Sequence, residues 1–324
     1  MTPDFPSTPM SPTARRTLEP VAAQGSRAYR LRRDESAGEG LRRILDARLD
    51  DALEQLHQRF DHEPAPAVHE ARKDLKKSRA VLRLARDGLD TQRYRLENGR
   101  LRDAGRALSD ARDAEVRIRT IEGLREHYRD RHPEAGQALD AEVAAVRHGA
   151  NGAGSAVALN EARQRSAALI EGSRDSIAEL ELGGGWKLVR GGLERGYRRG
   201  REGYRRAAAA EPDTVEMHEW RKRVKDLWYH LRLLRESWPP VVGALADQAG
   251  RLGELLGNHH DLATRAAELR SRPARGGDAA SVLELLELRQ GELLAEALPL
   301  GAALYGEKPG AFERRMHAYW RAWR

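Results

Sequence analysis

Apolar residues recur every three or four positions along most of the chain, which is the spacing of an amphipathic helix. No segment shows the alternation of apolar and polar residues that is typical of a half-buried strand. The pattern predicts helices over residues 37–60, 67–88, 93–129, 133–148, 158–182, 186–210, 214–238, 241–270, 279–297 and 312–323, with an interruption near Ser109–Asp110. The abundance of Ala, Leu, Arg and Glu, which are good helix formers, agrees with this. We therefore expect an all-α protein.

Proline and glycine divide the predicted helices into units. Residues 1–26 hold five prolines and show no helical period, so we expect a disordered tail. The segment Gly149–Ser155 is the clearest linker. We expect residues 27–324 to form a single domain of two helical repeats, about 27–150 and 156–324, with the second motif-bearing unit starting near residue 186. Two similar helical bundles are the simplest architecture.

One segment occurs twice. Val68–Leu84 reads VHEARKDLKKSRAVLRL and Met217–Leu233 reads MHEWRKRVKDLWYHLRL, 149 residues further on and aligned without a gap. Eight of the 17 positions are identical, where unrelated segments would share about one. The identical pairs are His69/His218, Glu70/Glu219, Arg72/Arg221, Lys73/Lys222, Lys76/Lys225, Leu82/Leu231, Arg83/Arg232 and Leu84/Leu233. The repetition indicates two copies of one structural unit.

Helical geometry separates each copy into a basic and an apolar face. Within an arc of roughly 120° the first copy places His69, Arg72, Lys73, Lys76, Arg79 and Arg83, and the second places His218, Arg221, Lys222, Lys225 and Arg232. The neighbouring arcs hold Val68, Ala71, Leu75, Ser78 and Leu82 in the first copy, and Met217, Trp220, Val224, Leu227 and Leu231 in the second. No carboxylate falls in the basic arc, since Glu70 and Asp74 lie to its side. A solvated face is the plain interpretation of one such stripe, but its repetition favours an anion site.

Composition sharpens this hypothesis. The chain has 324 residues and a formal net charge of +7, which favours a polyanionic partner. Only seven of its 57 basic residues are lysines, and five of these (Lys73, Lys76, Lys77, Lys222 and Lys225) lie in the two copies. The absence of cysteine and of an apolar run of about 20 residues leads us to expect a soluble cytoplasmic protein.

The duplicated pattern H-E-x-R-K-x-x-K resembles the CHAD domain, the conserved histidine α-helical domain. Leu108–Val116 (LSDARDAEV) and Leu256–Ala263 (LGNHHDLA) resemble the family's element that follows each motif, and Tyr197–Arg199 resembles the stretch before the second motif. The resemblance covers about residues 30–324. It implies two four-helix bundles related by pseudo-twofold symmetry around a basic central cavity. It also implies a link to inorganic polyphosphate and polyphosphate granules. Since no E-x-E-x-K motif occurs, we expect a stand-alone version.

Carried onto this chain, the resemblance gives a set of candidate ligands for polyphosphate. They are His69, Arg72, Lys73, Lys76, Arg79, Arg83, Arg112, Tyr197, Arg198, His218, Arg221, Lys222, Lys225 and Arg232. The second copy departs from the first where Trp228 replaces Arg79, and His260 and Asp261 replace Arg112 and Asp113. The two motif histidines are open to either of two roles, as packing residues or as direct donors to a phosphate oxygen.

The function expected from these residues is non-catalytic binding of polyphosphate, and three other classes of function are alternatives. Nucleic-acid binding is the first alternative, although aromatic residues are only 5% of the chain and a single-strand binder needs stacking platforms. A metal-dependent phosphohydrolase is less favoured, because no Walker loop occurs and Asn258–Asp261 offers only part of a ligand set. A scaffold without anion preference is the remaining option. We expect no catalytic residue, no metal and no cofactor, and a location in the cytoplasm or on polyphosphate granules.

Overall fold

The computed structural model describes residues 28–150, 156–209, 213–271 and 276–324, and every regular element in these ranges is a helix. The expected tail at residues 1–26 lies outside them. The α-helices are α1 Ala37–Glu54, α2 Pro64–Leu84, α3 Thr91–Ala107, α4 Asp110–Tyr128, α5 Gly136–Ala150, α6 Ala156–Ala178, α7 Trp186–Ala209, α8 Thr214–Leu233, α9 Pro239–Arg270, α10 Gly276–Leu304 and α11 Pro309–Trp323. The all-α prediction is confirmed.

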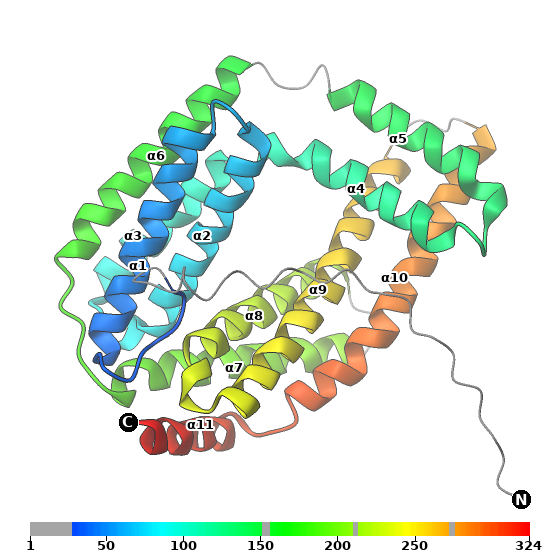
Figure 1. The fold of residues 1–324 in the computed structure, drawn as a ribbon. Helices are drawn as coiled ribbons and strands as arrows, with labels where there is room; N and C mark the ends of the chain where they lie inside the picture. The colour runs from blue at the N-terminus through cyan, green and yellow to red at the C-terminus, as the bar shows by residue number, and fades with distance from the viewer. Residues whose placement is uncertain (1–27, 151–155, 210–212, 272–275) are drawn as a thin grey trace, which may run out of the picture.

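The first half of the chain builds a bundle from α1, α2, α3 and α6, which pack against one another (Figure 1). Local signals begin these helices. Ser36 and Glu39 form a reciprocal capping box at the start of α1, and the carboxylate of Asp90 accepts the amide protons of the first turn of α3. Pro64 stands in the first turn of α2, where a missing N–H costs nothing. These signals mark where α1, α3 and α2, the first motif helix, start.

The second half builds a corresponding bundle from α7, α8, α9 and α10, and α11 lies against α7 (Figure 1). The carboxylate of Asp213 caps α8, the second motif helix, by accepting the Glu216 amide proton at 2.7 Å. A short 3-10 turn, Arg235–Ser237, separates α8 from α9. Pro239 and Pro240 then occupy the first turn of α9.

Helices α4 and α5 leave the first bundle and pack on the second. The predicted interruption is present, because α3 ends at Ala107 and α4 begins at Asp110. Helix α4 crosses to the distal parts of α9 and α10, as Figure 1 shows. There a separate hydrophobic cluster forms, with Leu124, Tyr128 and Leu139 from the first half and Leu262 and Leu286 from the second. The two halves of the chain therefore share part of their core.

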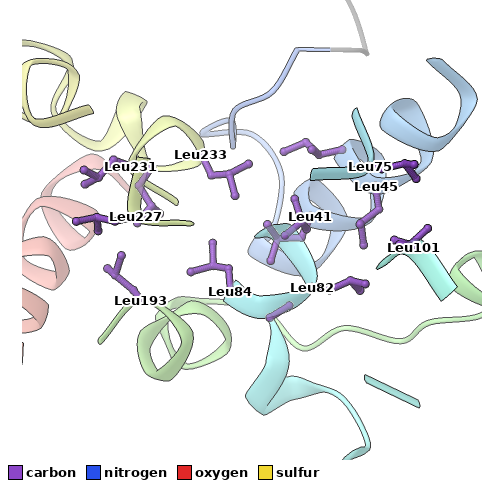
Figure 2. Packing of buried hydrophobic residues seen from close by; sticks show 14 of the residues in the cluster. Leu41, Leu45, Leu75, Leu82, Leu84, Leu101, Leu193, Leu227, Leu231 and Leu233 are labelled. Atoms are coloured by element: carbon purple, nitrogen blue, oxygen red, sulfur yellow. The ribbon is translucent and has the colours of Figure 1, made fainter. Parts of the chain in front are cut away.

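The main hydrophobic core runs through both bundles without a break. Figure 2 shows its leucines, among them Leu75, Leu82 and Leu84 from α2 and Leu227, Leu231 and Leu233 from α8. All ten residues predicted for the apolar arcs of the two motif helices are buried, which confirms the expected orientation of both helices. The opposite faces of α2 and α8 are thereby turned away from the core.

Several boundaries differ by a few residues from the sequence-based expectation, and three of them are informative. Helix α1 ends in a π-helical turn, Gln55–Arg59, instead of continuing to residue 60. Helix α5 includes the first two residues of the expected linker, whose remainder, 151–155, lies outside the described ranges. Helix α10 continues through Pro299 to Leu304, because buried Ala297 and Leu304 anchor both sides of the proline and only one backbone hydrogen bond is lost. No helix in the described ranges is both long and apolar enough to span a bilayer.

Candidate functional site

The basic residues of the two motif helices form two surfaces. We name as the first basic face His69, Arg72, Lys73, Lys76, Arg79 and Arg83 on α2, and as the second basic face His218, Arg221, Lys222, Lys225 and Arg232 on α8. Each of these side chains is at least partly exposed, whereas the apolar arcs beside them are buried. Lys76 and Lys222 are the most open positions. Lys77, the fifth lysine of the two copies, is instead buried and paired with Asp74 at 2.7 Å.

The first basic face is held to the end of α3 through Arg72. One of its terminal nitrogens, Nη1, donates to the Gly105 carbonyl and to the Ser109 hydroxyl oxygen, both at 2.7 Å. The guanidinium thus lies at the carboxyl end of α3, where the helix dipole favours a cation. Because α3 ends and α4 begins at this point, Arg72 joins the basic face to the junction of the two helices.

The second basic face lies along α9, where two glycines face its cations. A Cβ on Gly253 would lie 2.9 Å from Cε of Lys225, so glycine leaves the room that this side chain occupies. A Cβ on Gly257 would lie 3.4 Å from Nε of Arg221, which is an ordinary contact distance. Burial and the charge of Arg221 lower the pKa of Lys225, so the two cations stand close together.

Trp228 stands between two cations of the second basic face. Nζ of Lys225 lies 4.5 Å from the indole ring centre, and the Arg232 guanidinium carbon lies 5.1 Å from it. Arg232 also contacts the ring of Tyr29, at 5.4 Å. Such cation–π contacts hold flexible side chains in place. The tryptophan that replaces Arg79 therefore keeps its two basic neighbours ordered.

The carboxyl-terminal halves of α2 and α8 meet directly. Nη1 of Arg83 lies 2.7 Å from a carboxylate oxygen of Asp226, and His230 Nε2 donates to the Ala80 carbonyl at 3.0 Å. Nearby, Nε of Arg79 donates to the Asn98 side chain at 3.2 Å. Burial, followed by the charge of Arg83, lowers the pKa of Arg79 to about 10. The ends of the two basic faces are therefore neighbours in the fold.

Glutamates beside the basic arcs pair with a lysine of each face. Glu70 pairs with Lys73, and Glu219 lies 2.5 Å from the Lys222 ammonium. Burial acts to raise the pKa of Glu70, but the hydrogen bond and charge of Lys73, together with the other nearby cations, outweigh it and the pKa falls. The hydrogen bond from Lys222 lowers the pKa of Glu219. The glutamates lie outside the basic arcs, but long side chains at i and i+3 of a helix reach each other.

Two other candidates lie apart from the two faces, and a third cannot be compared with them. Tyr197 is fully buried in the core, where its hydroxyl donates to the Leu304 carbonyl at 3.2 Å and its ring stacks on Phe312. Arg198 is exposed on α7 and pairs with Glu194 at 2.7 Å. Arg112 belongs to the first turn of α4, and its side chain is outside the described part of the structure. Tyr197 therefore has a structural role, and its inclusion in the anion site is corrected.

One residue of the site, His260 on α9, was not among the candidate ligands. The rings of His218 and His260 lie with their centres 4.4 Å apart, which joins α8 to α9 beside Arg221. The only signal in the sequence was the string Asn258–Asp261, which aligns with the element after the first motif. Among the described residues, no three His, Cys, Asp or Glu side chains are grouped so as to hold a metal ion.

Comparisons with known proteins place this architecture. Among solved structures, the chain is similar to PptA from Streptomyces chartreusis, with a TM-score of 0.58 and 17% identity, over 84% of this chain and all of that one. It is also similar to the CHAD domain from the plant Ricinus communis, with a TM-score of 0.51 and 19% identity, over 90% of this chain and 96% of that one. No curated protein matches the chain. The family model of the CHAD domain matches residues 43–270, more than half of the sequence, and the chain therefore belongs to the CHAD domain family.

Proposed function

We propose that the protein binds inorganic polyphosphate without chemical turnover, through the first and second basic faces, and that this binding places it on polyphosphate granules. The CHAD family is linked to polyphosphate-related proteins. The observation that carries the proposal is the duplicated cationic face itself. It occurs on two helices that meet through Arg83 and Asp226, so the two copies belong to one region of the molecule.

The chemistry of the faces suits a chain of phosphoryl groups. Lysine and arginine supply point charges and forked donors for phosphate oxygens, and a linear polyphosphate needs no base-specific contact. A nucleobase would need an open aromatic surface, but cations already cover the ring of Trp228, the aromatic side chain of the second basic face.

The internal ion pairs do not compete strongly with such a ligand. The pairs Glu70–Lys73 and Glu219–Lys222 join half-exposed side chains, and exposed pairs contribute little to stability. A polyanion can therefore take over Lys73 and Lys222 at small cost, while the glutamates turn to solvent. Each ligand charge neutralised releases counterions, so the affinity should fall steeply with salt, as for nucleic-acid backbones.

A double charge reversal tests the proposal. We expect Lys73→Glu with Lys222→Glu to weaken binding of long-chain polyphosphate by about a hundredfold or more, because each reversal sets a like charge against the ligand. Titration at several salt concentrations, with circular dichroism as the folding check, measures this. The matched control is Lys187→Glu with Lys308→Glu, which makes the same change of net charge at two exposed lysines that belong to neither basic face.

Three outcomes would reject the proposal. The first is absence of binding by the unaltered protein at about 0.1 M salt, where screening is moderate. The second is an equal loss in the control variant, which would reduce the effect to net charge. The third is displacement of polyphosphate by RNA at equal phosphate concentration. Phosphate release from polyphosphate with added Mg²⁺, Mn²⁺ or Zn²⁺ would overturn the non-catalytic part alone.

A further inference from the structure

Two histidines of the second half are in ring contact at the amino-terminal end of the second basic face. His218 comes from α8 and His260 from α9, with ring centres 4.4 Å apart and planes inclined by 35°. The Nδ1 atoms of both rings are buried and have no hydrogen-bond partner among the described residues. A buried polar atom without a partner costs free energy, which an incoming hydrogen-bonding group would recover.

Two cations and two carboxylates act on the pair, and at each ring a cation acts more strongly than the carboxylate. Those that act on His218 are Lys222, Arg221 and Glu219 from its own helix, besides His260 itself. Those that act on His260 are Arg221 and Lys222 from α8 and Asp261 from α9. His259, the neighbour in the chain, is also affected by His260. The pair therefore stands where an anion would be attracted.

Both histidines are uncharged at neutral pH in this environment. Burial, followed by the charges of His260 and Lys222, lowers the pKa of His218 to about 4. Burial, followed by the charge of Arg221, lowers the pKa of His260. A negative group placed against the rings would oppose the effect of the cations and raise both pKa values.

The first half of the chain has a different residue at the position of His260. When Leu108–Asp113 is aligned with Leu256–Asp261, His260 corresponds to Arg112. An arginine is charged at every physiological pH, whereas a histidine changes its charge near neutrality. The element that follows the motif thus carries a permanent cation in the first half and a titratable side chain in the second.

We propose that His218 and His260 form a subsite for one phosphoryl oxyanion, in which the occupied pair holds a proton that the empty pair lacks. The inference rests on the proposed polyphosphate function. It adds to that function a residue, His260, and a coupling between anion binding and proton uptake. Binding takes up a proton from solvent, so the affinity rises as the pH falls. Reciprocity of linkage requires the anion to raise the pKa of the pair by the same free energy.

The pH profile of binding tests the subsite. If the anion returns the pair to the ordinary histidine range near 6.5, affinity for long-chain polyphosphate should rise about tenfold between pH 8 and pH 5.5. Calorimetry near pH 6.5 in buffers of different ionisation enthalpy should show uptake of part of a proton per site. In parallel, the histidine NMR signals should titrate at higher pH when inorganic phosphate is added.

Two variants of His260 separate a proton-linked role from a packing role. His260→Arg should bind at pH 8 at least as tightly as the unaltered protein and should lose the pH dependence. His260→Ala should bind more weakly at pH 5.5 and should also lose the pH dependence. His57→Ala is the control, because His57 is exposed on the π-helical turn and faces Glu171, and it should keep the unaltered profile.

The outcomes distinguish this inference from the function on which it rests. Tight polyphosphate binding with a flat pH profile and no proton uptake would overturn the subsite and leave the function standing. A His260→Ala variant with the unaltered profile would do the same. Absence of polyphosphate binding at any pH would reject the function, and the phosphate-induced shift of the histidine signals would then decide on the subsite alone.

Discussion

The two motif helices carry nearly the same cations, but the fold holds these cations by different means. Arg72 bonds the end of α3 at Gly105 and Ser109, where the first half breaks its third helix. Arg221 lies instead beside Gly257, in the middle of the unbroken helix α9. Ser109 and Gly257 correspond in the alignment of the two halves. The cationic surface has stayed similar in the two copies, while the residues that support it differ.

The ion pairs beneath the two basic faces also differ between the copies. In α2 the carboxylate of Asp74 pairs with Lys77, and in α8 Arg223 pairs with Asp226 at 3.3 Å. These positions correspond, with the two charges exchanged. The exchange gives Asp226 an additional partner across the helix contact, Arg83. The two charges of this ion pair can therefore exchange positions and the pair still forms within its helix.

The largest effect that separates the copies should come from the two aspartates. Asp74→Ala should lower the free energy of unfolding by about 3 to 5 kcal/mol, because it leaves the buried ammonium of Lys77 without its carboxylate, although Arg48 keeps Asp51. Asp226→Ala should cost less, about 1 to 3 kcal/mol, because Arg83 and Arg223 are more exposed and can reach water. Urea unfolding of both variants gives the comparison. Equal losses would show that burial of the partners does not decide the cost.

A smaller effect concerns His230, which stands where the first copy has Val81. Burial lowers its pKa to about 4, and its Nε2 must be the protonated nitrogen because it donates to the Ala80 carbonyl. Since an unfolded histidine binds a proton near pH 6.5, the unfolded state binds more protons between these values and stability falls as the pH is lowered. This histidine should account for a loss of about 2 kcal/mol between pH 7 and pH 5.

His230→Gln checks this contribution, because glutamine can still donate to the carbonyl but does not titrate. Urea unfolding at pH 7 and pH 5 should show a smaller loss in the variant than in the unaltered protein. The same loss in both proteins would contradict the assignment of the pH dependence to His230.

The smallest expected change in the free energy of unfolding should differ in sign between the two copies. Ser109→Ala removes a hydrogen bond from Arg72 and should destabilise by about 1 kcal/mol. Gly257→Ala places a methyl group at ordinary contact distance from Arg221 and replaces a glycine inside a helix, so it should stabilise by about 0.5 to 1 kcal/mol. Thermal unfolding of the two variants measures both shifts. Shifts of the same sign would show that the supports are more alike than their contacts indicate.

The sequence predicted what depends on local order and left out what depends on distant contacts. The helical period and the proline positions were enough to place the helices and to bury the correct face of α2 and α8. Pro299 misled the prediction, because packing on both sides of a proline cannot be read from the proline. Tyr197 was assigned to the site by resemblance, but its burial is decided by α11 and the end of α10. The contact between His218 and His260 joins residues 42 positions apart, and no local pattern indicates it.

The crossing of α4 and α5 onto α9 and α10 makes each half of the chain depend on the other for folding. Tyr128 and Leu139 complete a cluster whose remaining members, such as Leu262 and Leu286, are encoded at the opposite end of the gene. A cut between α6 and α7, at residues 179–185, would therefore give two fragments that each expose an incomplete core. Such fragments would regain the native structure only by reassociating, and an isolated half would not reproduce an ancestral protein of a single unit.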